Sequence, residues 1–171
     1  MRRRQERPTL GNVQLTSQVR DALRVEARAA KDVERGGLAI GYRVGPDVIV
    51  TDIIAVADTT ATRSSYIRGD VAARATLNAY LMHLEPDSIQ GYVGEWHTHA
   101  SPSPPSETDR RAMRAMARSN ELPVVLLVAA LSLNRVDVNF YALISGQGRV
   151  GDRARGAFLD AMLTTWRPAP N

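Results

Sequence analysis

Two of the three histidines in this sequence lie within one short segment, Glu95-Trp96-His97-Thr98-His99. In an extended strand, residues two apart point to the same side, so His97 and His99 can converge on one ion. Asp109 follows ten residues after His99, in the predicted first turn of a helix. Two imidazoles and one carboxylate are three ligands for a tetrahedral zinc, and three protein ligands with an open fourth position are typical of a catalytic site. A zinc ion in such a site lowers the pKa of water to about 7 and so provides a nucleophile at neutral pH.

The same spacing also fits two surface or core histidines beside a proline-rich loop. Spacing alone does not separate these two interpretations. The sequence has no cysteine, so any metal must be held by His, Asp or Glu. The third histidine, His83, falls late in a predicted helix, where a cationic or half-buried histidine is common, and we do not expect it to bind metal.

Hydrolysis at a metal site needs a general base, and Glu34 is the candidate. Glu34 stands just before a predicted strand that begins with Gly36-Gly37, where the absence of side chains allows a close approach of the backbone. A charged residue at the end of a helix is the alternative interpretation. Ser106 has two roles that do not compete: as an N-cap it satisfies helix amides, and as a site residue its hydroxyl can donate to a developing oxyanion.

Four other residues near these motifs also need an interpretation. Glu95 alternates onto the face of His97, where it either supports the ligand or, as we favour, is a solvated strand charge. Trp96 points to the opposite face and is predicted to lie in the core. Tyr66 and Arg68 follow a polar loop, and we expect them to pack that loop rather than to contact a substrate tail.

The elements that must position these residues alternate between strand and helix patterns. The β-branched run over residues 48–56 is typical of a strand, and apolar residues recur at helical spacing after Thr16. We predict strands over residues 12–15, 38–43, 48–56, 90–96, 124–132 and 137–144. We predict helices over residues 17–33, 70–84, 106–118 and 152–165. These elements together indicate a mixed α/β domain.

Length and composition favour one globular domain, because two cores of about 85 residues would each be marginal. We predict a basic, flexible arm over residues 1–9 and a single domain over residues 10–171. The net charge is +4, but no aromatic-studded basic surface accompanies the arm, so we do not expect a nucleic-acid partner. No apolar run reaches the length of a membrane helix, and no apolar segment follows the basic start. We therefore expect a cytoplasmic protein without a membrane segment.

Taken together, Glu34 before Gly36-Gly37, then His97-Thr98-His99, then Ser106 and Asp109 resemble the JAMM motif of JAB/MPN zinc metalloproteases. The resemblance covers about residues 12–144. It implies an α/β, JAB/MPN-like (cytidine-deaminase-like) fold, with a curved mixed β-sheet flanked by helices. It also implies zinc at His97, His99 and Asp109, with Glu34 as the general base and Ser106 as the oxyanion stabiliser.

Two sequences, Gly-Glu-Trp-His-Thr-His and Ser-x-Thr-Asp-Arg-Arg, make the chain similar to the compact bacterial branch of this family. That resemblance implies hydrolysis of a peptide or isopeptide bond after the tail of a ubiquitin-like protein, or at a conjugated enzyme such as a cyclic-nucleotide synthase. The setting it implies is an antiphage (CBASS-like) conjugation system with a co-encoded ThiF-type activating and conjugating enzyme. The alternatives are a JAB peptidase that processes sulfur carriers and a non-catalytic scaffold that binds a ubiquitin-like partner.

Two features depart from the family pattern. Ala100 stands where the family has a proline after the second histidine. The spacer between His99 and Asp109 has nine residues, one fewer than is usual in the family. We expect the three prolines between residues 102 and 105 to supply the rigidity of this shorter loop.

Overall fold

The computed structural model describes residues 11–30, 32–146, 149–150, 153–154, 157–160 and 163–165. The predicted basic arm, residues 1–9, lies outside the described residues. The described helices are α1 (Ser17–Ala29), α2 (Asp70–Leu81) and α3 (Glu107–Ser119). The described strands are β1 (Val13–Leu15), β2 (Gly36–Val44), β3 (Asp47–Ala55), β4 (Gly91–His99), β5 (Val125–Leu131), β6 (Val138–Gly146), β7 (Arg149–Val150), β8 (Arg153–Ala154), β9 (Ala157–Asp160) and β10 (Leu163–Thr165).

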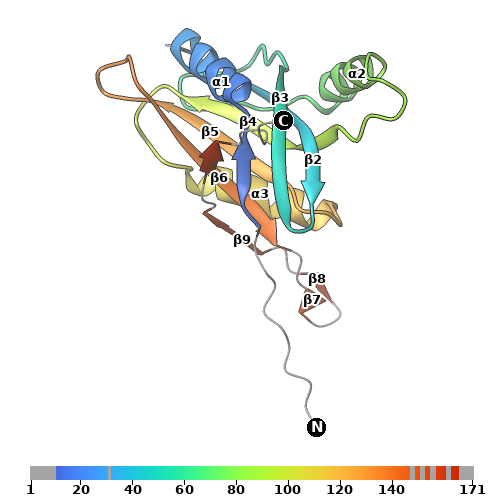
Figure 1. Cartoon of the computed structure of the whole chain (residues 1–171). Helices are drawn as coiled ribbons and strands as arrows, with labels where there is room; N and C mark the ends of the chain where they lie inside the picture. Colours follow the sequence, from blue (N-terminus) through green and yellow to red (C-terminus); the bar gives the residue numbers. More distant parts are fainter. Residues whose placement is uncertain are drawn as a thin grey trace.

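Eight of these strands form one mixed sheet in the order β10-β1-β3-β2-β4-β5-β6-β9 (Figure 1). Strand β1 runs parallel to both β10 and β3, and β4 runs parallel to β5. The other neighbours in this sheet are antiparallel. The predicted fold class, an α/β domain with a curved mixed sheet flanked by helices, is therefore confirmed.

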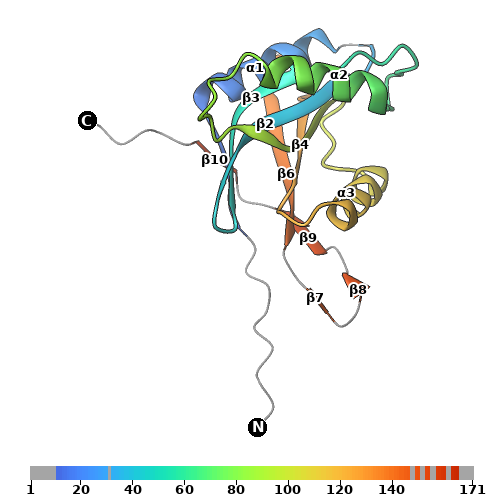
Figure 2. The same ribbon diagram turned by 90° about the vertical axis from the view of Figure 1, so that its right-hand side faces the viewer.

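The helices cover both faces of the sheet. Three residues at a spacing of four, Val19, Leu23 and Ala27, bury the apolar stripe of α1 against the larger core cluster, which includes Trp96. On the other face, Ala73 of α2 packs among residues of β2, and Met113 of α3 packs among residues of β5 and β6. Figure 2 shows α3 standing beside the central strands of the sheet. Side chains of β4 on this face of the sheet therefore lie between α2 and α3.

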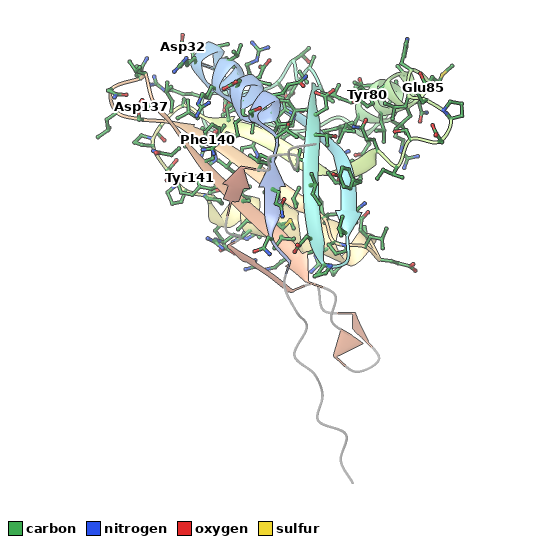
Figure 3. All side chains as sticks on the ribbon, viewed as in Figure 1. Asp32, Tyr80, Glu85, Asp137, Phe140 and Tyr141 are labelled. Atoms are coloured by element: carbon green, nitrogen blue, oxygen red, sulfur yellow. The ribbon has the colours of Figure 1, made fainter. Side chains whose placement is uncertain are left out.

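The outer surface of α1 is attached to the sheet by arginine side chains. The guanidinium carbons of Arg20 and Arg24 lie 5.3 and 5.5 Å from the ring centroid of Phe140, which is on β6 (Figure 3). Arg28 donates two hydrogen bonds to the carbonyl oxygen of Val136. None of the helices in the described part of the chain has the length and apolar character that a membrane crossing requires.

The last predicted helix, over residues 152–165, is wrong. This stretch instead contributes β8, β9 and β10, of which β9 pairs with β6 and β10 pairs with β1. An unpaired sheet edge presents N–H and C=O groups that a further strand can satisfy. Gly156 within the stretch and the β-branched pair Thr164-Thr165 also weaken a helix there.

Several boundaries differ from the prediction by a few residues, and two of them bear on the site. Helix α1 ends at Ala29 rather than near Val33: Ala30 is its C-cap, and residues 32–35 lie outside the helix. Strand β4 continues beyond Trp96 as far as His99. This extension puts both histidines of the motif on one regular strand, paired on one side with β2 and on the other with β5.

Candidate metal centre

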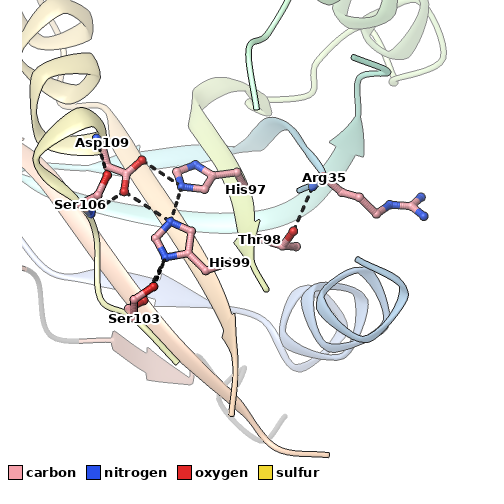
Figure 4. A network of polar contacts seen from close by, with 7 residues as sticks. All are labelled: Arg35, His97, Thr98, His99, Ser103, Ser106 and Asp109. Atoms are coloured by element: carbon pink, nitrogen blue, oxygen red, sulfur yellow. Dashed lines mark hydrogen bonds and ion pairs between the residues drawn. The ribbon is translucent and has the colours of Figure 1, made fainter. Parts of the chain in front are cut away.

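Strand β4 and the first turn of α3 bring three side chains together. His97 Nε2 lies 3.1 Å from His99 Nε2 and 3.1 Å from Asp109 Oδ1, while His99 Nε2 lies 3.4 Å from Asp109 Oδ2 (Figure 4). The three side chains are mostly buried, with exposed fractions of 11%, 8% and 12% for His97, His99 and Asp109. The predicted convergence of this group is therefore present in the structure.

The donor atoms of this group fit one metal ion. Two ring nitrogens that face each other across 3.1 Å repel if each presents a lone pair, unless a shared cation lies between them. Ligands about 2.0–2.2 Å from a tetrahedral ion are separated from one another by about 3.3–3.5 Å, close to the distances found here. The three side chains line one cavity, so an ion bound by them would face that cavity.

A backbone carbonyl orients His99. The ring Nδ1 of His99 lies 3.0 Å from the carbonyl oxygen of Ser103, and a carbonyl can only accept a hydrogen bond. Nδ1 therefore carries the hydrogen, and Nε2 faces the other donors: it donates to the Asp109 carboxylate when the ring is protonated, and it offers a lone pair to a metal ion when the ring is neutral. Sequence reasoning missed this contact, because a carbonyl oxygen is common to every residue and gives no signal in the sequence.

Ser106 and Asp109 form the predicted capping box at the start of α3. The Asp109 N–H donates to Ser106 Oγ at 3.2 Å, and the Ser106 N–H donates to the Asp109 carboxylate. Burial by itself would raise the pKa of Asp109, but hydrogen bonds from His97 and His99 outweigh it and hold that pKa far below its usual range. Asp109 is thus an anion whose position is fixed by its own helix.

Glu34 lines the same cavity as the three donors, a space of about 630 Å³. Its side chain is mostly buried, and its N–H donates to the Thr62 carbonyl oxygen at 2.8 Å. Burial raises the pKa of Glu34, and the nearby rings of His97 and His99 partly oppose that rise. A buried carboxylate with a raised pKa is suited to receiving and returning a proton.

Residues that follow Glu34 are paired directly with the histidine strand. The Arg35 N–H donates to Thr98 Oγ1 at 3.0 Å, and the Thr98 N–H donates to the Arg35 carbonyl at 2.8 Å (Figure 4). Gly36 stands opposite His97 in the register of β2 and β4. The predicted need for close backbone approach is met at Gly37, where a Cβ atom would lie 1.9 Å from the Ile54 carbonyl oxygen.

Two walls enclose the rest of the cavity. One wall is the loop between β3 and α2, and the other is the inner side of α3 with Ala112, Ala115 and Met116. Glu95 and Arg68 also line the cavity, and Arg68 Nε lies 3.1 Å from Glu95 Oε1. Burial raises the pKa of Glu95, and Arg68 opposes that rise.

The family model named Prok-JAB, described as prokaryotic homologs of the JAB domain, matches residues 16–144 of this chain. The chain belongs to this family. The matched range contains the three donors as well as Glu34 and Ser106. The family resemblance in the sequence is therefore confirmed.

Named relatives of the Prok-JAB chain include two enzymes. The probable metalloprotease y4qB of Sinorhizobium fredii is 29% identical over 116 residues, which are 63% of this chain and 70% of that protein. The CD-NTase/cGAS isopeptidase of Vibrio cholerae is 30% identical over 105 residues, which are 56% of this chain and 61% of that protein. These relatives support a hydrolase of the peptidase class, and the buried His-His-Asp group suggests that it uses a metal ion.

A solved structure supports the fold of the Prok-JAB chain. The solution structure of protein DSY2949 from Desulfitobacterium hafniense matches with a TM-score of 0.59 and 17% sequence identity. The match covers 90% of this chain and 94% of that chain. Similarity at this level of identity concerns the fold alone.

Other expectations for the Prok-JAB chain have mixed outcomes. Trp96 is core, as predicted, with 1% of its surface exposed. His83 lies outside the donor group and contacts the Ala79 carbonyl through Nδ1. The expectation that Glu95 is a solvated charge is wrong, because Arg68 on the neighbouring loop covers and pairs with it. Tyr66 packs its loop as predicted, with its hydroxyl on the Val56 carbonyl, although Tyr66 and Arg68 also line the cavity.

Proposed function

We propose that this chain is a zinc-dependent peptidase that hydrolyses a peptide or isopeptide bond, carried by a single domain over residues 10–171. The observation that carries the proposal is the convergence of three buried metal-ligating side chains with a buried glutamate in one cavity. A structural zinc site would be closed by a fourth protein ligand and would need no glutamate beside it. A non-catalytic scaffold that binds a ubiquitin-like partner would not need this arrangement of side chains.

His97, His99 and Asp109 would hold the zinc ion. Two imidazole nitrogens and a carboxylate oxygen are ligands that zinc accepts, and the sequence has no cysteine to offer a thiolate. A zinc ion bound there supplies Lewis-acid chemistry, which lowers the pKa of water and polarises a scissile carbonyl. The Ser103 carbonyl keeps the His99 ring turned so that Nε2 can act as a ligand.

Glu34 would act as the general base and then as the general acid. Its carboxylate takes a proton from the attacking water and returns it to the leaving amine nitrogen. Burial supports this role, because it raises the pKa of Glu34 above that of an ordinary glutamate. Two backbone contacts, with Thr62 and through Arg35 with Thr98, hold the segment that carries this carboxylate.

Ser106 would stabilise the oxyanion that forms on the scissile carbonyl. Its Oγ accepts a hydrogen bond from the Asp109 N–H, and its hydroxyl, which hydrogen-bonds to the Asp109 carboxylate in this structure, would donate to the oxyanion instead. Its position at the N-terminus of α3 adds the positive end of the helix dipole beside a developing negative charge.

For the substrate we propose the C-terminal tail of a ubiquitin-like protein or a conjugated cyclic-nucleotide synthase, in a CBASS-like system with a ThiF-type conjugating enzyme. The Vibrio cholerae relative is named as an isopeptidase for CD-NTases, which supports this choice over a sulfur carrier. The cavity is lined by the β3–α2 loop and by Ala112 and Ala115 of α3, whose small side chains leave room for the extended tail.

The test is a cleavage assay with two substrates. Purified chain is loaded with zinc and offered a CD-NTase joined through its C-terminus to a lysine-containing peptide, and separately a sulfur-carrier precursor. Mass spectrometry should show release of the CD-NTase by the wild type and none by His97→Ala. Cleavage of the carrier alone would favour the alternative peptidase, and failure to cleave either substrate while zinc is bound would count against a peptidase.

A further inference from the structure

The loop between β3 and α2, residues 58–68, is held together by its own hydrogen bonds. The Asp58 carboxylate accepts from the Thr60 N–H and from the Ile67 N–H, each at 2.8 Å. Thr62 and Ser65 form an isolated antiparallel bridge inside the loop. Because its two ends are joined through Asp58, the β3–α2 loop behaves as one compact unit.

The β3–α2 loop supports the backbone around Glu34. The Glu34 N–H donates to the Thr62 carbonyl oxygen at 2.8 Å. The ring of Tyr66 lies against Gly36, where a Cβ atom would be 2.5 Å from Tyr66 Cε1. A displacement of this loop would therefore move Glu34 and the start of β2.

The same loop is attached to the histidine strand by a largely buried ion pair. Arg68 Nε lies 3.1 Å from Glu95 Oε1, and Arg68 Nη2 lies 3.0 Å from Asp70 Oδ1. Only 27% of the Arg68 side chain and 18% of the Glu95 side chain are exposed. Glu95 precedes His97 by two residues on the same face of β4, so the ion pair joins the loop to the strand that carries two of the three donors.

We propose that the Arg68–Glu95 ion pair is a positioning element for Glu34. The pair fixes the β3–α2 loop against β4, and the loop in turn fixes Glu34 through the Thr62 carbonyl. The consequence for catalysis rests on the proposed role of Glu34 as the base. Removing Arg68 also leaves the Glu95 carboxylate without its cationic partner in a cavity that already contains the carboxylates of Glu34 and Asp109.

The first arm of the test needs no metal and no substrate. Hydrogen exchange of the Glu34 amide is followed by NMR in the metal-free wild type, in Arg68→Met and in Glu95→Gln. Both variants should speed this exchange about tenfold or more, because the acceptor loop is released. Arg24→Met is the matched control, since it removes an arginine ion pair with Asp21 on α1. Unchanged exchange at Glu34 in both cavity variants, with the fold intact by circular dichroism, would overturn the proposal.

The second arm measures catalysis. In the zinc-loaded chain, Arg68→Met should lower kcat about 10- to 100-fold, the scale expected for a displaced catalytic group, with zinc affinity and KM little changed. Arg68→Lys should restore part of kcat. The double variant Arg68→Met/Glu95→Gln should have the same kcat as Arg68→Met alone, because both substitutions break the same ion pair. Additive losses in the double variant, or a loss confined to KM, would contradict a positioning role.

These two arms separate the failure of the inference from the failure of the proposed function. If the wild type neither binds zinc nor cleaves a substrate, the proposed function fails, while the exchange of the Glu34 amide still decides whether the ion pair holds the loop.

Discussion

Arg35 and Thr98 are hydrogen-bonded to each other in both directions. The Arg35 N–H donates to Thr98 Oγ1 at 3.0 Å, and the Thr98 N–H donates to the Arg35 carbonyl at 2.8 Å. Thr98 is completely buried and stands between the two histidines, while Arg35 directly follows Glu34. This pair therefore sets the distance between the proposed base and the proposed zinc ligands.

Substitution Thr98→Val should remove the acceptor of the Arg35 N–H without changing the shape of the side chain. We expect kcat to fall about 10- to 100-fold because Glu34 loses its alignment, while zinc stays bound. We also expect a loss of about 1 kcal/mol in the free energy of unfolding, since a half-buried N–H loses its hydrogen bond. Steady-state kinetics and denaturant unfolding measure both effects. Thr98→Ser keeps the hydroxyl and should stay near the wild type; if the two variants lost kcat equally, packing rather than the hydrogen bond would be responsible.

Zinc should stabilise the folded chain. At a free zinc concentration about 100 times Kd, the free energy of unfolding should rise by about 2.7 kcal/mol, because the ion binds the folded state. His97→Ala should abolish this gain, and elemental analysis should show about one zinc per wild-type chain and little in the variant. A wild type that gained neither zinc nor stability would refute the metal centre.

Asp109 has two functions that a second pair of variants can separate. Asp109→Ala removes both a proposed zinc ligand and the acceptor of the capping box, so its metal-free form should also lose about 1 kcal/mol of stability. Asp109→Asn keeps an oxygen for the Ser106 N–H and should lose zinc with a smaller loss of metal-free stability. Denaturant unfolding of both variants in the presence of a chelator, with the wild type alongside, measures the difference.

Glu34→Gln separates metal binding from chemistry. The amide is the same size as the carboxylate but cannot accept the proton, so zinc should stay while kcat falls about 100- to 10,000-fold. Zinc content and single-turnover kinetics are the measurements. Turnover near that of the wild type would mean that a different residue is the base, and Glu95 in the same cavity would be examined next.

The proline-rich loop should help zinc binding by limiting the conformations that the loop can adopt before zinc binds. Proline lowers the conformational entropy of a flexible segment by about 0.4–1 kcal/mol per residue, so Pro104→Ala/Pro105→Ala should weaken zinc affinity about 4- to 30-fold. Competition with a chelator measures the affinity. The control is Pro86→Ala, in the exposed connection between α2 and β4. An affinity equal to that of the wild type would show that the His99–Ser103 contact alone is enough to order the loop.

Stability at high pH should depend on Tyr66. Burial first, and then the charges of Glu95 and Asp58, raise the pKa of Tyr66 to about 12, against an ordinary value of 10.0. A group whose pKa is raised in the folded state contributes stability that is complete below pH 10 and is lost as the pH rises through about 12. The free energy of unfolding should therefore fall more steeply between pH 10 and pH 12 in the wild type than in Tyr66→Phe.

The comparison with Tyr66→Phe isolates this tyrosine. The sequence has one lysine and four other tyrosines that titrate at high pH, and burial also raises the pKa of Tyr80 to about 12. The difference in tyrosinate absorbance between the two proteins gives the titration of Tyr66. Equal slopes of stability against pH in the two proteins would show that the Tyr66 hydroxyl is not held in the folded state.

The features that the sequence determined by itself are local. His97 and His99 are two residues apart on a strand, so the sequence alone places them on one face. Ser106 and Asp109 are three residues apart, which predicts the cap of α3. Each pattern depends only on the geometry of one strand or one helix. The alternation of strand and helix patterns was likewise enough for the α/β class. These properties arise within a few residues of chain and need no knowledge of the remaining fold.

The tertiary structure decided what depends on residues far apart in the chain. Arg35 and Thr98 are 63 residues apart, and only the pairing of β2 with β4 brings the proposed base to the histidines. Arg68, from a separate loop, covers the Glu95 carboxylate. The strand position of Glu95 alone had suggested that this carboxylate is exposed. Every residue has a backbone carbonyl, so residue type could not identify the Ser103 carbonyl as the contact of His99. Finally, residues 157–160 and 163–165 form strands because the edges of β6 and β1 offer them hydrogen-bond partners, which outweigh their own weak preference for a helix.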